Sequence, residues 1–217
     1  MAQCTAVGNS TVYRIYTSDD LGTVYAKTRR LLDLRSPTCC RSYVSAYIEL
    51  DTHRDLARYL PLDRAHISAD VPAELFDQVA AVLDPHLPAT RRMARGRDGS
   101  AYLMAGLSND VIAALSELPQ LEATVFTREH ELHEDPADLV VAAVGTDPAS
   151  LSWRVCWHGR HNGAGFELGL NGVEMWHRDP VPGHSLYVHV GPDEEELAQG
   201  LARAVRGGIL GEAASGW

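Results

Sequence analysis

Hydrophobic and polar residues alternate over several short stretches with the period of two that is typical of β-strands. This alternation predicts strands at 11–17, 43–50, 101–108, 122–132 and 185–190. Elsewhere apolar residues recur at three- and four-residue spacing, which predicts amphipathic helices after Ser18, near 52–60, from Pro72 and around 111–115. We therefore expect an α+β fold, a mostly antiparallel sheet with amphipathic helices packed on one face.

Charge and proline divide this pattern into two associated lobes. The segment 133–138 is charged and broken by Pro136, which predicts a boundary between an N-terminal α+β lobe, 11–135, and a C-terminal α+β lobe, 136–210. Residues 1–10 and 211–217 are small, polar and glycine-rich, so we expect flexible ends. Residues 139–145 stay ambiguous, because Asp135-Pro136 is typical of a helix start whereas the valines that follow favour a strand.

The segment 165–177 gives the strongest local prediction. Asn171-Gly172, flanked by alternating residues, is typical of a two-residue type I′ hairpin turn. This turn would pair 165–170 with 173–177 and place on one face Phe166, Leu168, Leu170, Val173, Met175 and His177. A helix at 193–206 follows, with Asp193 as its N-cap and glutamates in its first turn.

The same period of two sends a polar and aromatic set to the opposite face of the C-terminal sheet. Its members are Arg154, His158, Glu167, Glu174, Trp176, Tyr187 and His189. Tryptophan, tyrosine and arginine contribute most to binding at interfaces, so the set predicts a partner-binding surface. The alternative is an ordinary solvated sheet face on which Trp176 and Tyr187 cover long charged side chains.

A second group of charged residues lies in the arginine-rich segment 89–100. Its arginines are Arg91, Arg92, Arg95 and Arg97. One interpretation is a solvated loop; the other is a clamp for a carboxylate-rich partner, because guanidinium groups bind carboxylates in forked pairs. We include the four arginines among the candidate partner-binding residues.

Composition narrows the classes of function. The 217 residues are 45% hydrophobic, which is enough for a sizeable core. A net charge of −10 argues against nucleic acid as a partner, because phosphate binding needs a basic surface. No apolar run reaches the roughly 20 residues of a membrane span and no secretory signal is visible, so we expect no membrane association and a cytoplasmic location. Lys27 is the only lysine among 19 basic residues, a bias that indicates a GC-rich, bacterial genome.

Motifs for metal binding and nucleophilic catalysis are missing from the sequence. The cysteines are Cys4, Cys39, Cys40 and Cys156, and none has the C-x2-C spacing of a zinc site, so we expect reduced thiols. Histidines spaced by three occur at 130 and 133 and at 158 and 161, but in a β-like run such residues point to opposite faces. We expect no metal, no cofactor and no catalytic residues.

These observations favour a non-catalytic accessory protein that binds a peptide or a protein, by strand addition at an open edge or on the aromatic face. Precursor-peptide binding in a biosynthetic pathway and toxin neutralisation are both activities of this kind. The alternatives are a hydrolase or transferase that uses His158 or His189 with Glu167 or Glu174 as acid and base, and a small-ligand sensor with a pocket between the lobes. The sequence leaves a homodimer open.

Overall fold

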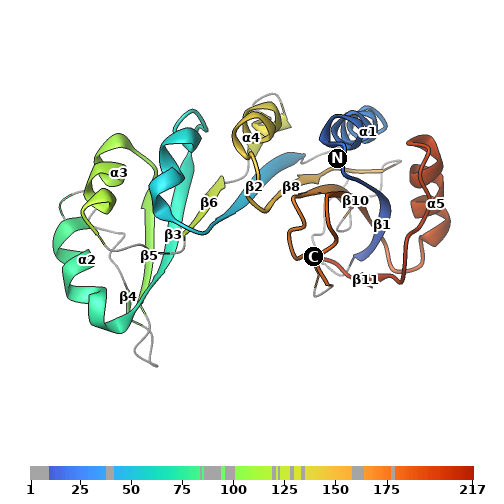
Figure 1. Ribbon diagram of the computed structural model, residues 1–217. Helices are drawn as coiled ribbons and strands as arrows, with labels where there is room; N and C mark the ends of the chain where they lie inside the picture. The colour runs from blue at the N-terminus through green and yellow to red at the C-terminus, as the bar shows by residue number, and fades with distance from the viewer. Residues whose placement is uncertain are drawn as a thin grey trace, which may run out of the picture. The chain divides into compact units, whose positions relative to one another are not determined.

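The computed structural model describes residues 10–37, 42–83, 85, 94–95, 101–118, 121, 123–127, 130–132, 135–157, 164–176 and 179–217. Helices and strands follow one another along the chain, and the described strand pairs are antiparallel (Figure 1). The predicted α+β fold is confirmed. Within the described ranges, every helix is too short or too polar to cross a bilayer.

Two compact units make up the chain, and neither is continuous in sequence. Unit 1 comprises Met1–Val44, His130–Asp135 and Pro148–Trp217, and unit 2 comprises Ser45–Glu129 and Pro136–Asp147. The predicted lobes instead divide the chain at a single point after residue 135. The difference arises because the first strand pairs with a strand from near the end of the chain, and the first helix packs on the same strands. Local composition does not reveal such a long-range association.

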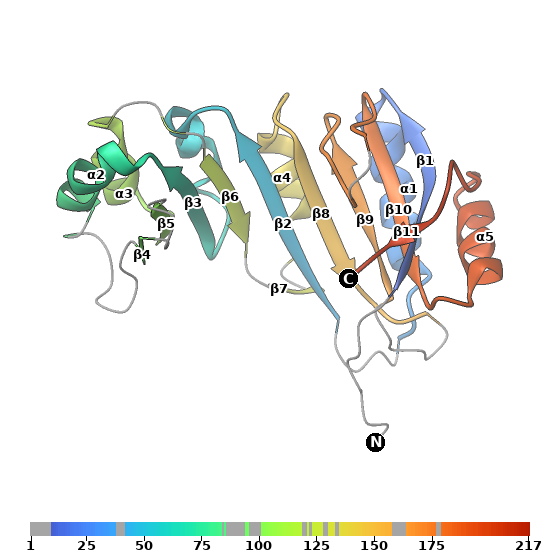
Figure 2. The ribbon, with the colours of Figure 1, turned by 90° about the horizontal axis from the view of Figure 1, so that it is seen from below.

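Unit 1 is a sheet in the strand order β11-β1-β10-β9-β8. Its strands are β1 (Thr11–Ser18), β8 (Ala149–Arg154), β9 (Gly165–Leu170), β10 (His184–Val190) and β11 (Ala214–Ser215). Its helices are α1 (Leu21–Asp33) and α5 (Glu195–Ala204), while β7 (His130–Glu131) pairs with the first residues of β2 (Tyr43–Leu50). In Figure 2, α1 lies behind these strands and the segment that carries β11 crosses in front of them.

The face of this sheet toward α1 is a hydrophobic core. Phe166 lies between Trp153 and Val188 in the strand pairing, and all three are fully buried. The rings of Trp153 and Phe166 stack with centroids 4.9 Å apart. The helix begins after Asp20, whose carboxylate accepts the Gly22 N–H at 3.1 Å; the N-cap is therefore two residues later than the predicted start at Ser18.

The hairpin prediction is confirmed at the turn and wrong in the pairing beyond it. Asn171 and Gly172 have φ of 55° and 72°, and the Val173 N–H donates to Leu170 O at 3.2 Å. Residues 173–176, however, form no strand, and β9 pairs with β8 and β10 instead. Residues 173–176 instead fold over the sheet face that points away from α1, where a Cβ on Gly169 would lie 2.9 Å from Met175 Sδ. The reason is competition for the edge of β9: β10 is buried at every position, so it gains more from the pairing.

Unit 2 is built in the strand order β2-β6-β3-β5-β4. Its strands beyond β2 are β3 (Ala65–Val71), β4 (Ala94–Arg95), β5 (Ala101–Gly106) and β6 (Ala123–Thr127). Its α-helices are α2 (Phe76–Leu83), α3 (Asn109–Ser116) and α4 (Ala137–Ala143), with 3-10 turns η1 (His53–Tyr59) and η2 (Ala73–Leu75).

Helix α4 settles the ambiguous stretch 139–145. It begins after Pro136 and buries Ala137 and Val140. After the helix, the carboxylate of Asp147 contacts η1: it pairs with Arg58 and accepts a hydrogen bond from the Tyr59 hydroxyl at 2.7 Å. Burial of one apolar side therefore outweighs the weak strand preference of the valines.

Candidate functional site

The polar face of unit 1 collects part of the predicted partner-binding set. Glu167, Tyr187 and His189 lie on it together, as predicted, but they are only 4%, 4% and 0% exposed. Arg154 and Trp176 are half-buried at its margin, and Glu174 is exposed. Of the remaining candidates, His158, Arg91, Arg92 and Arg97 lie outside the described residues, and only the backbone of Arg95, in β4, is described.

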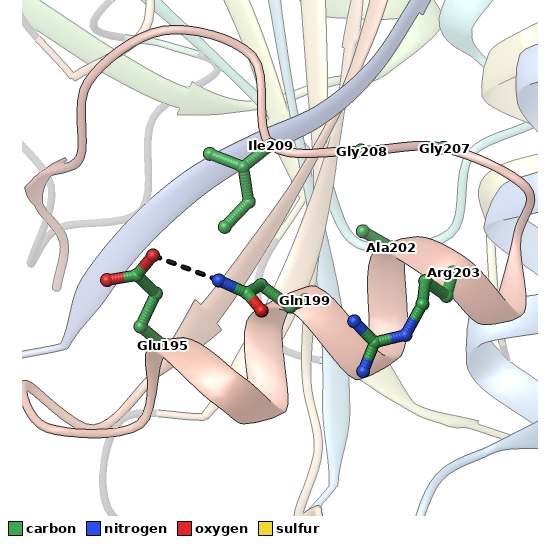
Figure 3. A pocket seen from close by; sticks show the side chains of 7 residues that line it. All are labelled: Glu195, Gln199, Ala202, Arg203, Gly207, Gly208 and Ile209. Carbon is green, nitrogen blue, oxygen red and sulfur yellow. Dashed lines mark hydrogen bonds between the residues drawn. The ribbon is translucent and has the colours of Figure 1, made fainter.

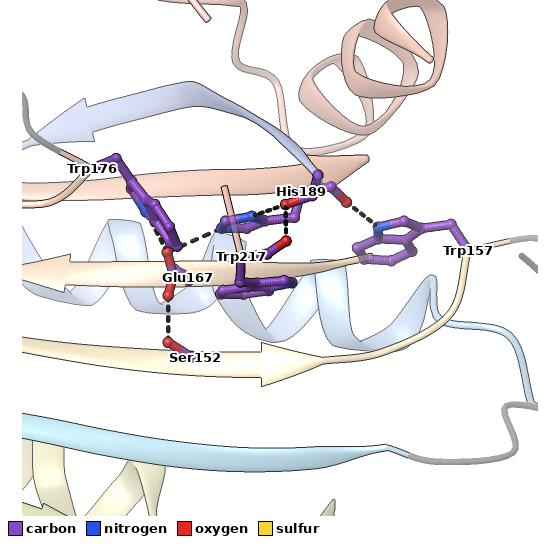
Figure 4. Close-up of polar contacts among 7 residues, drawn as sticks. Ser152, Trp157, Glu167, Trp176, His189 and Trp217 are labelled. Atoms are coloured by element: carbon purple, nitrogen blue, oxygen red, sulfur yellow. Dashed lines mark hydrogen bonds and ion pairs between the residues drawn. The ribbon is translucent and has the colours of Figure 1, made fainter. Parts of the chain in front are cut away.

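The carboxylate of Glu167 is the centre of a buried hydrogen-bond network (Figure 4). Oε1 accepts the Ser152 hydroxyl at 2.5 Å, and Oε2 accepts the indole N–H of Trp176 at 2.6 Å. Nε2 of His189 lies 3.0 Å from the same Oε2. A buried carboxylate requires such donors, because an unpaired charge that is removed from water lowers stability by on the order of several kcal/mol. The network brings together three strands and the loop after Gly172.

The imidazole of His189 joins this network to the start of β1. Its Nδ1 lies 3.0 Å from Ser10 Oγ, and Trp157 donates its indole N–H to the His189 carbonyl at 3.2 Å. Burial lowers the pKa of His189, and this effect outweighs the opposing hydrogen bond and charge of Glu167. Burial thus favours the neutral ring. A carboxylate oxygen accepts hydrogen bonds, so we assign the ring proton to Nε2, which leaves Nδ1 to accept the Ser10 hydroxyl.

Trp217 covers His189 from the solvent side. The centres of the two rings are 3.5 Å apart, with 8° between the ring planes. The Arg154 guanidinium carbon lies 4.3 Å from the centre of the Trp217 ring. Trp176 contacts the Trp217 ring edge-on, with 5.6 Å between the ring centres. We call the place that the Trp217 ring occupies, bounded by His189, Arg154, Trp176 and Gly165, the indole site. Residues 211–217, which the sequence analysis expects to be a flexible end, thus lie against this face in the structure.

Two glycines make the indole site possible. A Cβ on Gly165 would lie 2.2 Å from the Trp153 carbonyl oxygen and 3.0 Å from Cζ2 of Trp217, and a Cβ on Gly216 would lie 2.6 Å from Nδ1 of His189 and still closer to Ser10 Oγ. A side chain at Gly165 would therefore disturb the pairing of β9 with β8 as well as crowd the Trp217 ring, and one at Gly216 would push the backbone beside Trp217 away from the sheet. The predicted open contact face is thus closed by the chain itself, through Trp217 on one side and residues 173–176 on the other.

Beside this closed face lies an open groove of about 540 Å³, the Trp176 groove. Its walls include Arg14, Trp176, Asp179 and residues 210–214, among them Glu212. A bulge in the β1–β10 pairing follows Arg14, and bulges re-aim neighbouring side chains. Trp176 has φ of 60°, a left-handed conformation that costs a bulky side chain about 1–3 kcal/mol and that clusters at functional sites.

A smaller hollow of about 270 Å³ lies between α5 and residues 207–209 (Figure 3). Two of its polar side chains are bonded to each other: Gln199 Nε2 donates to Glu195 Oε1 at 3.1 Å. We assign it no role in the site.

The chemistry of metals and thiols adds one correction. In the part of the chain that the structure describes, no three His, Cys, Asp or Glu residues gather in a way that could hold a metal ion. Cys156 is disulfide-bonded, so the prediction of reduced thiols is wrong for this cysteine; its partner lies outside the described residues.

Three residues of the site were missed in the sequence. Ser152 carries a visible signal, because it lies two positions before Arg154 in the same alternation. Ser10 continues the alternation of β1 by one residue, and Trp217 is an isolated large aromatic residue in a small, polar stretch. Comparison with known proteins gives no family assignment: no protein-family model, curated protein or solved structure matches the chain.

Proposed function

We propose that the protein is a non-catalytic accessory protein that binds a peptide or protein partner at the Trp176 groove. The observation that supports this most directly is the half-buried indole of Trp176 in an open groove, on a backbone held in a strained conformation. Strain of this kind persists only where the surrounding structure enforces it. Trp176 is also a predicted contact residue that is still partly accessible. Precursor-peptide binding in a biosynthetic pathway and toxin neutralisation are both examples of this function.

Arg14 supplies the polar part of the groove. Its side chain is half-buried in the groove wall, and among the described residues no hydrogen-bond partner reaches its buried Nε. The accessible part of the guanidinium offers N–H donors to a backbone carbonyl of a partner. Arginine and tryptophan are both among the residues most enriched at strongly contributing interface positions.

Charge favours a basic partner. The chain carries a net charge of −10, and Asp179 and Glu212 line the groove next to Arg14. Opposite charge accelerates encounter and orients the partner, and both effects weaken as salt is added. We therefore expect association rates to fall with ionic strength.

Selection of peptides from a random display library on the immobilised protein tests this function. Peptides that bind should be basic. Trp176→Ala should weaken their binding by about 2 kcal/mol, roughly thirtyfold in affinity. Arg14→Gln should weaken them less, and the exposed Glu174→Gln should change little. Peptides that are indifferent to Trp176 and Arg14, or no selected peptides at all, would contradict the groove as the binding site.

A second candidate function, an acyl-transferring or hydrolytic enzyme, is favoured by one observation. Ser10, His189 and Glu167 are joined in the order hydroxyl, imidazole, carboxylate, with both steps at 3.0 Å. Against it, all three side chains are buried and Trp217 lies over the imidazole. A fluorophosphonate probe decides between the two: labelling of Ser10 that Ser10→Ala and His189→Gln abolish would favour the enzyme. We expect no labelling.

Location and oligomeric state stay predictions. A cytoplasmic location is expected from the sequence, whereas a disulfide at Cys156 is more typical of an oxidising compartment. Alkylation of the protein isolated from its source, followed by mass spectrometry of Cys156, would test the two expectations against each other.

A further inference from the structure

Residues 210–217, which we call the closing segment, lie along the outer edge of β1. The Leu210 N–H donates to Arg14 O at 2.8 Å, Ala214 and Ser215 pair with Val12 and Thr11, and the Gly216 N–H donates to Ser10 O at 2.8 Å. The segment thus acts as an added strand on an edge that would otherwise present unpaired backbone groups. Strand addition of this kind is the way in which many domains bind extended peptides.

The indole site supplies the side-chain half of this attachment. The Trp217 ring stacks on the His189 ring with 3.5 Å between the ring centres. The guanidinium carbon of Arg154 lies 4.3 Å from the centre of the Trp217 ring. Backbone pairing on β1 and one aromatic ring in a polar, aromatic site are the two elements of an extended-peptide complex, here made within one chain.

The closing segment is held weakly compared with the strands that it covers. None of its residues is fully buried, and Leu210 to Ala213 and Ser215 are exposed, whereas β9 and β10 are buried throughout. Its ladder with β1 comprises two residue pairs, to which the Ser10 N–H adds a bond to Trp217 O at 3.1 Å. Gly211, with φ of 78°, lies between this ladder and the bond that Leu210 makes to Arg14. Elements with exposed backbone hydrogen bonds and few buried contacts open at low free-energy cost.

We propose that the closing segment is displaceable and that the partner takes its place, pairing an extended stretch with β1 and inserting an aromatic side chain, tryptophan by preference, into the indole site. This rests on the proposed binding function and names the partner chemistry: an extended segment with one exposed aromatic residue. Residues 210–214 of the closing segment form one wall of the Trp176 groove, so a partner that takes the segment's place replaces this wall and still contacts Trp176 and Arg14. The chain's own segment then competes with the partner, so binding is tightest in protein whose closing segment has been released.

Fluorescence anisotropy with a labelled peptide of residues 208–217 tests the exchange directly. Two full-length variants release the segment by different means: Trp217→Ala removes the ring, and Gly216→Ala places a Cβ against His189 and Ser10. Both variants should bind the peptide about tenfold or more tightly than the wild type does, because a tethered segment competes at an effective concentration in the millimolar range. Ser215→Ala, an exposed change in the same segment, should behave as wild type.

The peptide itself carries a matched control. A probe in which tryptophan is replaced by alanine should not bind either released variant, and one with phenylalanine should bind with intermediate affinity. Equal binding of the tryptophan and alanine probes would overturn the role of the indole site.

Two further outcomes would overturn the proposal. If Trp217→Ala and Gly216→Ala remain folded by circular dichroism and bind no probe, the segment is not exchangeable. If both lose cooperative unfolding, the segment is part of the fold itself. The proposed function fails by a different result, selected peptides that ignore Trp176 and Arg14, so the two failures are distinguishable.

Discussion

The two faces of the unit 1 sheet are buried by different means. Toward α1, side chains such as Phe166 and Val188 come from strands that already pair, and apolar contact alone closes the core. On the polar face, burial of Glu167 and His189 requires a donor from the loop after Gly172, a hydroxyl from Ser10 and a ring from Trp217. Hydrophobic burial is non-directional and tolerates rearrangement, whereas buried polar groups need specific partners.

Removing a large side chain from the apolar face should give the largest loss of stability. Phe166→Ala leaves a cavity beside Trp153, which we expect to cost about 3–5 kcal/mol in urea unfolding. Leu210→Ala, at an exposed position of the same unit, should stay within about 0.5 kcal/mol of the wild type. A loss below about 1 kcal/mol for Phe166→Ala would show that this face repacks more freely than its burial indicates.

Removing the central carboxylate should break the polar face. Glu167→Ala deprives Ser152, Trp176 and His189 of their common acceptor, with an expected cost of about 2–3 kcal/mol. Glu174→Ala is the matched control, because this glutamate is exposed, and it should be nearly neutral. Equal free energies of unfolding for the two variants would mean that water replaces the network.

The turn that directs residues 173–176 onto the polar face should give a smaller effect. Gly172→Val forces a β-branched residue to φ of 72°, which should lower stability by about 1–2 kcal/mol. Gly200→Ala in α5, where a Cβ meets nothing within 4 Å, should instead stabilise by about 0.5–1 kcal/mol. An unchanged melting temperature for Gly172→Val would count against the turn.

The protonation of His189 should give the smallest and most specific effect. Burial depresses its pKa in the folded state below the ordinary value of 6.5, so near and below pH 6.5 the unfolded chain binds the proton first. The free energy of unfolding should therefore fall as the pH is lowered through this range. In His189→Gln, chemical unfolding between pH 8 and pH 5 should show a flatter dependence. A parallel dependence in both proteins would assign the effect to other groups.

Sequence patterns predicted individual elements well where one side of the element is buried. The alternating stretch 43–50 is strand β2 with the same bounds, and the apolar spacing after Ser18 is helix α1. No strand was predicted at β3, because six of its seven residues are buried and the sequence therefore does not alternate. The lobes were harder to predict, since β1 joins the unit 1 sheet through pairing with β10, more than 160 residues later.

The sequence by itself determined which residues share a face. Glu167, Tyr187 and His189 lie together as the period of two requires, because alternation is a property of the extended backbone and needs no tertiary contact. The turn at Asn171-Gly172 is determined in the same local way. What covers that face was decided only in the tertiary structure, because β10 displaces 173–176 from β9 and Trp217 finds room over Gly165. Such outcomes depend on competition between segments far apart in the chain, for which the local pattern carries no signal.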